Sequence, residues 1–209
     1  MDAVTSAGSI AAVVRASTMD EHRAAEERPF IVELMGGKLS LADYARYLAQ
    51  FAWVYSALES RTTTPSDPQF FDPALARFAS IDHDLGALGA GDWRSSHPAL
   101  RATVAYVSRL RSIPAEDIIR WTAHYYTRYL GDLSGGQAIA RLVARNYGAT
   151  AHQLTFFDFT ELGDLVPIKR AYREGLDSLD LSDAGLDALV TEVKLAYALN
   201  SALFDELGQ

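Results

Sequence analysis

The sequence predicts an all-α fold with about eight helices in a single domain that spans residues 1–209. Apolar residues recur at intervals of three and four in most segments, and this spacing places them on one face of an α-helix. No segment alternates apolar and polar residues in the way that indicates a β-strand. Hydrophobic residues make up 49% of the 209 positions, which is enough for one sizeable core. Within this domain we expect residues 1–9 to be flexible.

The first third of the chain contains three predicted helices. Apolar spacing indicates a first helix from Ile10 to Glu27 and a short second helix from Phe30 to Met35, which two glycines end. Ser40 starts a long helix that continues to about Arg61, because Asp43 stands three residues later, as in a capping box. This long helix carries a wide apolar stripe.

The middle of the chain alternates predicted helices with connections. Residues 62–73 are rich in Thr, Pro and Asp and are predicted to form a loop. Helices are expected over Ala74–Leu88 and from Pro98 to about Ile113, with a turn around Trp93 between them. Pro114 is expected at the first position of the following helix, where its missing N–H has no cost.

The last quarter of the chain is predicted to contain two helices. A short segment with three phenylalanines follows Gly148 and precedes them. Pro167 is expected to start the first of the two helices, and Ser182 is expected to cap the second. Both helices carry apolar residues at helical spacing.

Three glycines interrupt the helix predicted over residues 115–147. They lie in the segment RYLGDLSGGQ, residues 128–137. Each Gly inside a helix costs about 1 kcal/mol relative to Ala, so we expect either a bend or a close approach to this backbone. Gly131 and Gly135 share one face, with Asp132 beside them. The residues alone leave open a contact with another helix and a cofactor site, and Asp132 could pair with Arg128, hold a water molecule, or do both.

His22 is the candidate ligand of an iron atom. Glu26 stands one turn later and can orient the imidazole. None of the five histidines belongs to an HExxH or ExxH motif, and a single His suits an iron whose other ligands come from a porphyrin. A His on a partly apolar helix face is also common as a packing residue. His83, between Asp82 and Asp84, fits a solvated helix face better than a metal site.

Composition excludes several classes of function. The formal net charge of −8 argues against nucleic acid as the main partner. No apolar run approaches the roughly 20 residues of a membrane-spanning helix, and no signal peptide is expected. Cysteine is absent, which removes disulfides and thiolate ligands and is typical of a cytoplasmic protein.

The segment RYLGDLSGGQ resembles the distal-helix signature of the haem oxygenase family, in particular its soluble bacterial members. Further similarities follow in chain order over about residues 15–207, in the segments 21–26, 55–59, 169–179 and 200–207. This resemblance implies an all-α fold in which haem lies between a proximal N-terminal helix and a kinked, glycine-rich distal helix.

The resemblance also implies roles for individual residues. His22 would be the axial iron ligand, with Glu26 as its orienting partner. The residues that would form the distal side are Gly131 and Gly135, which let the helix approach haem, and Asp132, Tyr55 and Arg128, which hold and surround a water molecule. The residues that would fix the two haem propionates are Arg15, Tyr126, Lys169 and Arg173.

The activity implied by the resemblance is oxidative cleavage of haem at a meso carbon, with the α position as the family default. Haem b would be both substrate and cofactor, and the products would be biliverdin, CO and free iron. The reaction requires O2 and electrons from an external donor such as a ferredoxin or a flavoprotein reductase. We expect a monomer with no membrane partner. A protein that binds or stores haem without turnover is the alternative, and a related all-α fold with thiamine-type or di-iron chemistry is a weaker one.

Overall fold

The structure is a computed structural model that describes residues 9–209, and every regular element within them is helical. The all-α prediction is therefore confirmed. The structure has eleven α-helices where about eight were expected, because several predicted helices are interrupted. These α-helices are α1 (Ile10–Ser17), α2 (Met19–Glu26), α3 (Pro29–Met35), α4 (Leu41–Glu59), α5 (Phe78–Ala87), α6 (Trp93–Ser96), α7 (Arg101–Ser112), α8 (Ile118–Tyr125), α9 (Gly131–Tyr147), α10 (Leu165–Asp177) and α11 (Asp183–Leu207).

Short turns of other helix types connect these elements. A π-helical turn, η2, joins α8 to α9 over Tyr126–Leu130. The 3₁₀ turns are η1 (Pro73–Leu75), η3 (Ala151–Gln153), η4 (Thr155–Phe157) and η5 (Thr160–Leu162). The last three of these turns are the regular elements of the connection between α9 and α10, which has no long helix of its own.

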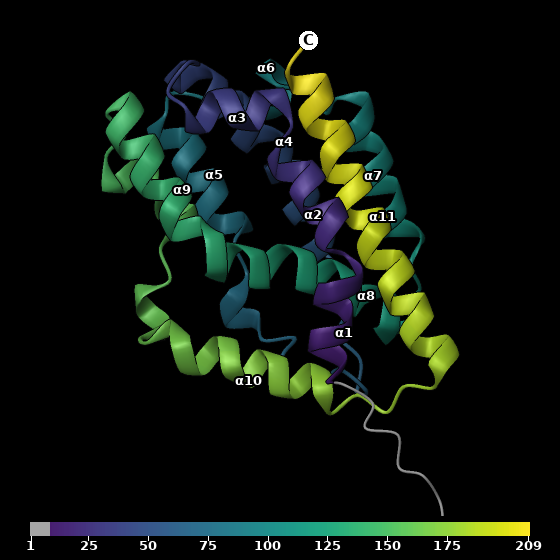
Figure 1. Cartoon of the computed structure of the whole chain (residues 1–209). Coiled ribbons are helices and arrows are strands. Elements are labelled where there is room, and N and C mark those ends of the chain that lie inside the picture. The colour runs from purple at the N-terminus through teal and green to yellow at the C-terminus, as the bar shows by residue number, and fades with distance from the viewer. Residues whose placement is uncertain (1–8) are drawn as a thin grey trace, which may run out of the picture.

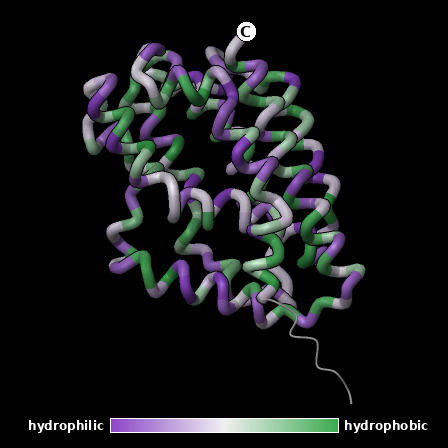
Figure 2. The backbone as a smooth tube through the Cα atoms, viewed as in Figure 1, coloured by the Kyte–Doolittle hydropathy of each residue, from purple (hydrophilic) through white to green (hydrophobic). Residues whose placement is uncertain are grey.

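Helix α4 lies at the centre of the fold and packs against α5 and α7. Its aromatic residues Tyr44, Tyr47, Phe51 and Tyr55 are all buried. Helix α11 packs against α2, α7 and α8 along one side of the molecule, and α10 runs below the line of α8 and α9 (Figure 1). Hydrophobic and hydrophilic residues alternate along each helix, as expected for helices that bury one face (Figure 2).

The sequence located some helix ends correctly. Ser40 caps α4 as predicted: its hydroxyl accepts from the Asp43 N–H at 3.1 Å, and the Asp43 carboxylate accepts from the Ser40 N–H at 3.0 Å. Ser182 caps α11 by accepting from the Gly185 N–H at 3.2 Å. Gly37, just after α3, has the positive φ of 72° that favours glycine.

The first predicted helix, Ile10 to Glu27, is wrong as one element because it is broken at Thr18. The Thr18 hydroxyl donates to the Val14 carbonyl at 2.8 Å, and its backbone (φ −121°, ψ 11°) leaves the helical region. A threonine that bonds back to the preceding turn offers the backbone an alternative to the regular helix. The chain therefore forms two short helices, α1 and α2, in place of one long helix.

Four other predicted starts are displaced. Pro114 is not the first residue of a helix, because α8 is capped by Asp117, whose carboxylate accepts from the Arg120 N–H at 3.1 Å. Helix α5 begins at Phe78 after a 3₁₀ turn, α7 begins at Arg101, and α10 begins at Leu165. In addition, the turn predicted around Trp93 contains the short helix α6. The prediction that residues 1–9 are flexible concerns residues outside those described, except for Ser9, whose hydroxyl caps α1.

Candidate functional site

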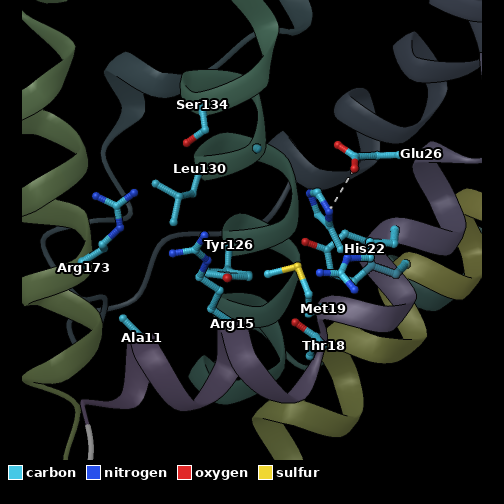
Figure 3. A pocket seen from close by; sticks show the side chains of 13 residues that line it. Ala11, Arg15, Thr18, Met19, His22, Glu26, Tyr126, Leu130, Ser134 and Arg173 are labelled. Carbon is cyan, nitrogen blue, oxygen red and sulfur yellow. Dashed lines mark ion pairs between the residues drawn. The ribbon is translucent and has the colours of Figure 1, made fainter.

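One wall of the candidate site is formed by α2, which presents His22. The imidazole Nδ1 lies 3.4 Å from Glu26 Oε2, one turn along the helix, and this pair is marked in Figure 3. The Tyr197 ring of α11 meets the imidazole edge-on, with ring centroids 5.5 Å apart. The His22 side chain is 42% exposed and lines a cavity, so a ligand there can reach the imidazole. Glu26 thus lies within reach of His22, and its role in orienting the imidazole stays a prediction.

The opposite wall is formed by the start of α9. A Cβ added at Gly131 or at Gly135 would meet no atom of residues 9–209 within 4 Å, apart from the helix's own nearby backbone. These two glycines therefore do not serve a helix–helix contact, which was one of the two interpretations left open. They leave a strip of bare backbone facing open space, as a close-lying flat ligand requires.

The π-helical turn η2 immediately precedes this bare strip. It widens the helix over five residues, and such turns are rare and are frequent at functional sites. Figure 1 shows that the ribbon of α8, η2 and the first part of α9 crosses the molecule and then bends within α9. The kinked, glycine-rich helix was predicted. The π turn was not, because the apolar residues of Tyr126–Leu130 keep ordinary helical spacing.

Two adjoining cavities, of about 480 and 420 Å³, lie between α2 and α9. Both are lined by His22, Glu26, Gly131, Ser134 and Tyr197. The residues that line only the larger, more apolar cavity include Tyr47, Phe51, Arg128, Asp132, Gly135, Ile139, Phe157, Asn200 and Phe204. Residues 110 positions apart in sequence, such as His22 and Asp132, therefore share one space.

The smaller cavity is lined by three of the four predicted propionate-binding residues. Arg15 of α1, Tyr126 of the π turn and Arg173 of α10 line it together (Figure 3). Lys169 lies one turn before Arg173 but lines neither cavity. Its carbonyl accepts from Arg173 Nη1 at 3.3 Å. The structure therefore brings three of the four predicted propionate-binding residues to one opening and leaves Lys169 beside it.

Asp132 lies at the edge of the larger cavity, where the Tyr55 hydroxyl donates to its Oδ2. Burial raises the pKa of Asp132 to about 6, although the Arg128 charge and the Tyr55 hydrogen bond both oppose the rise. Burial and the Asp132 charge raise the pKa of Tyr55 well above its usual range, so the hydroxyl keeps its proton. The pair can therefore accept and release a proton near neutral pH.

Arg128 is buried beside this pair, and its guanidinium lies 5.0 Å from the centroid of the Phe51 ring. Within residues 9–209 Arg128 forms no ion pair with Asp132, so the pairing that the sequence left open as one role of Asp132 is not observed. Arg128 acts on the carboxylate through its charge. Arg128 Nε is buried without a hydrogen-bond partner, as is Asn200 Oδ1, which lines the same cavity. Such unpaired buried groups are costly and indicate that a ligand or water completes them.

The sequence did not identify several residues that line the site. Tyr197 and Asn200 lie one turn apart on α11, where the apolar spacing identified only a packing face. Phe157 reaches the site from η4, and no local pattern relates it to α9. Its long-range contact is visible only in the fold.

The described part of the chain lacks two other features. No group of three or more His, Cys, Asp or Glu side chains in residues 9–209 could hold a metal ion. No helix in the same residues is both long and apolar enough to cross a membrane.

The chain is similar to known proteins over nearly its whole length. The family model described as "Heme oxygenase" matches residues 8–206. A heme oxygenase of Rhodella violacea is 32% identical over 204 residues, which cover 95% of this chain and 87% of that protein. The crystal structure of heme oxygenase-1 from Synechocystis in complex with heme superposes with a TM-score of 0.89 at 29% identity, covering 96% of this chain and 92% of that one. The heme oxygenase of Leptospira interrogans also has a TM-score of 0.89, at 33% identity and with coverage of 95% and 100%.

Proposed function

Because the chain belongs to the haem oxygenase family and is therefore an oxidoreductase that cleaves haem, we propose that haem lies between α2 and α9 with His22 as the axial iron ligand. The observation that carries this proposal is that His22 and the bare backbone of Gly131 and Gly135 line the same cavity from two different helices. An imidazole oriented by a carboxylate is a typical haem-iron ligand.

The residues present fit haem in three respects. The larger cavity is mostly apolar and aromatic, which suits a porphyrin ring. The glycine strip offers a surface without side chains, on which a flat ring can lie closely. The smaller cavity carries two arginines at an open edge, which suits two carboxylates that remain in contact with water. When bound, haem b supplies both the carbon skeleton that is cleaved and the iron that activates O2.

We infer that Asp132 manages protons on the distal side. With a pKa raised to about 6, its carboxyl is partly protonated near neutral pH, so it can give a proton to a group it contacts and be reprotonated from solvent. The Tyr55 hydroxyl orients the carboxylate by donating to Oδ2, and the buried Arg128 charge keeps a useful fraction ionised. A water molecule held by Asp132 would connect these groups to O2 in the space above the glycine strip.

Arg15, Tyr126 and Arg173 are proposed to fix the two haem propionates. They come from α1, the π turn and α10, so they approach the opening from three elements. Charged hydrogen bonds of this kind determine orientation as well as affinity. The orientation of the ring in turn determines which meso carbon faces the distal pocket, and we expect the α position. Lys169 is proposed as an additional cation at the outer edge of this opening.

Electrons are proposed to come from an acidic donor such as a ferredoxin or a flavoprotein reductase. Arg15, Arg23 and Arg173 lie around the opening of the smaller cavity, and all three are exposed. The whole chain has a formal net charge of −8, so a local group of cations at the opening is a distinctive docking surface. Both walls of the site come from one chain, which supports action as a monomer.

The test is turnover of bound haem. The protein is loaded with haem and supplied with O2 and either ascorbate or a ferredoxin–reductase couple. We expect the haem Soret band to be replaced by biliverdin absorption, CO to be released, and chromatography of the bilin to identify one meso isomer. A Soret band that persists under active reduction would contradict the proposal.

A further inference from the structure

Gly136 has a different surrounding from the two glycines of the bare strip. A Cβ added at Gly136 would lie 2.9 Å from Cδ1 of Phe157, closer than real Cβ contacts come. Gly131 and Gly135 have no such neighbour. The third glycine of the RYLGDLSGGQ segment therefore serves a contact between α9 and η4, and it allows the Phe157 ring to rest directly on the helix backbone.

A hydrogen bond holds Phe157 in place beside this contact. The Gln137 side chain, next to Gly136, donates from Nε2 to the Phe157 carbonyl at 2.6 Å. The neighbouring Phe156 ring meets the Tyr55 ring edge-on, with centroids 5.5 Å apart. Turn η4 thus touches both the glycine-bearing part of α9 and the tyrosine that donates to Asp132.

Turn η4 is itself held by one buried carboxylate, that of Asp84 in α5. Asp84 Oδ1 accepts from the Thr155 N–H at 2.9 Å and from the Thr155 hydroxyl at 2.6 Å, and Oδ2 accepts from the Phe156 N–H at 2.8 Å. The side chain is completely buried. The connection between α9 and α10 contains only 3₁₀ turns, so these three hydrogen bonds are a major constraint on its position.

Further contacts tie the same connection to α5. The Thr155 hydroxyl also lies 3.3 Å from the Ser80 carbonyl, and two more contacts lie nearer the surface. Gln153 Nε2 donates to the Ala87 carbonyl at 3.0 Å, and the His83 and His152 rings meet with nitrogens 3.2 Å apart. Both contacts lie nearer the surface than Asp84, and the His pair is exposed. The Asp84 contacts are the buried part of this junction and are protected from competition with water.

We propose that Asp84 is a positioning residue that fixes the distal wall of the haem site through η4. The contacts run from Asp84 to Thr155 and Phe156, and then from Phe157 to Gly136. They set how closely the glycine strip of α9 approaches α2, and therefore how the distal wall restricts access to one meso carbon. This inference rests on the proposed binding of haem in the cavity, but its structural part can be measured without haem.

The sharpest variant is Asp84→Asn, which keeps size and shape. In either orientation its NH2 group replaces an acceptor of a backbone N–H, that of Thr155 or that of Phe156, so at least one of these hydrogen bonds is lost. Asp82→Asn is the matched control, because it is the same substitution on the same helix. Asp82 does not contact η4: its Oδ1 accepts from Trp93 Nε1 at 2.8 Å. Thr155→Val removes only the hydroxyl donor and is the milder second variant if Asp84→Asn does not fold.

Two measurements are compared between the wild type and these variants. Amide hydrogen exchange of the haem-free protein is expected to become about tenfold faster in residues 131–140 of Asp84→Asn, and to stay unchanged in α2 and in Asp82→Asn. With haem and a reductant, the minor bilin isomers are expected to rise several-fold in Asp84→Asn, while the haem dissociation constant changes less than about threefold. Thr155→Val should show smaller changes in the same direction.

The outcomes separate this proposal from the proposed function. Unchanged exchange in residues 131–140 overturns it whether or not the wild type cleaves haem. An unchanged isomer ratio beside an active wild type also overturns it. A wild type that makes no bilin counts against the proposed function, and the exchange measurement then decides the positioning role. A double variant gives a last check. Adding Phe157→Leu to Gly136→Ala should return the amide hydrogen exchange rates to wild-type values, because it removes the ring that the new Cβ would meet.

Discussion

At the scale of single residues, the Asp132 carboxyl combines two opposing influences. Burial disfavours its charge, whereas the Arg128 guanidinium and the Tyr55 hydroxyl favour it. Burial prevails, and the pKa rises to about 6. An acid with this pKa in a pocket beside a tyrosine is suited to proton transfer, but holding it there lowers the stability of the fold at neutral pH.

That cost predicts a pH-dependent difference in stability. Because the folded-state pKa of Asp132 is raised, its contribution to the free energy of unfolding is complete below pH 4 and is lost as the pH rises through 6. Between pH 4 and pH 7, the free energy of unfolding of the wild type is expected to fall by up to about 3 kcal/mol relative to that of Asp132→Asn. Urea denaturation at each pH measures it. Asp43→Asn is the control of opposite sign, because a hydrogen bond from Ser40 lowers the pKa of Asp43.

The proposed role of His22 predicts a change in the absorption spectrum of bound haem when this residue is substituted. His22→Ala removes the proposed iron ligand and, because the side chain is 42% exposed, only a small buried contact with Tyr197. We expect the variant to fold with thermal stability close to that of the wild type and to lose the absorption spectrum of histidine-ligated haem. Added imidazole should restore that spectrum by occupying the vacated position.

The matched control for this variant is His97→Ala, which removes a histidine outside both cavities. A His22→Ala protein that keeps the wild-type haem spectrum in the absence of imidazole would mean that another residue ligates the iron.

At the scale of elements, the three glycines of α9 divide into two kinds, and substitution should separate them. Gly135→Ala meets no protein atom and should stabilise the haem-free protein by up to about 1 kcal/mol through helix propensity. The same Cβ enters the space proposed for haem, so haem affinity should fall. Gly136→Ala should instead destabilise the haem-free protein by about 1–3 kcal/mol, because its Cβ lies 2.9 Å from the Phe157 ring.

Thermal unfolding of the haem-free variants, followed by haem titration, measures both effects. Equal changes in stability for Gly135→Ala and Gly136→Ala would contradict the division. So would a Gly135→Ala protein that binds haem as tightly as the wild type.

Features that depend on residues close together in sequence could be predicted at this scale. Ser40 with Asp43, and Gly131 with Gly135, act through local spacing, and the sequence located both. The break at Thr18 was missed because a threonine can sit inside a helix or bond back and interrupt it, and apolar spacing does not distinguish the two. The π turn was missed for the same reason, since Tyr126–Leu130 keeps helical periodicity.

The candidate site was predictable mainly through its resemblance to a known family. That resemblance brought His22, Tyr55 and Asp132 into one hypothesis, although they lie far apart in sequence. The roles of Asp84 and Phe157 could not be found in this way, because they depend on how an irregular connection packs between two helices. Such contacts have no sequence period to reveal them.

At the scale of the whole molecule, the charge distribution predicts how an electron donor docks. Arg23 is exposed at the opening of the smaller cavity, in a chain whose formal net charge is −8. Arg23→Glu should slow ferredoxin-supported turnover several-fold at low ionic strength, because it replaces an attractive charge with a repulsive one. The difference from the wild type should shrink as salt is added.

Turnover supported by ascorbate should be unchanged in Arg23→Glu, because a small reductant needs no docking surface. Arg111→Glu is the matched control: Arg111 is also exposed, and it lies at the end of α7, outside both cavities. Equal slowing by Arg23→Glu and Arg111→Glu would show that only the net charge matters.

The two walls of the site also differ in how firmly they are attached, and this difference bears on the release of product. Helix α2 has eight residues and buries only one of them, Ala25. Its ties to α11 include the ion pair between Lys194 and Glu21 at 2.9 Å and the edge contact of His22 with Tyr197. The facing helix α9 is held by buried contacts through Phe157. Because displacing α2 exposes little apolar surface, we expect α2 to move when a rigid ring has become an open-chain product and must leave.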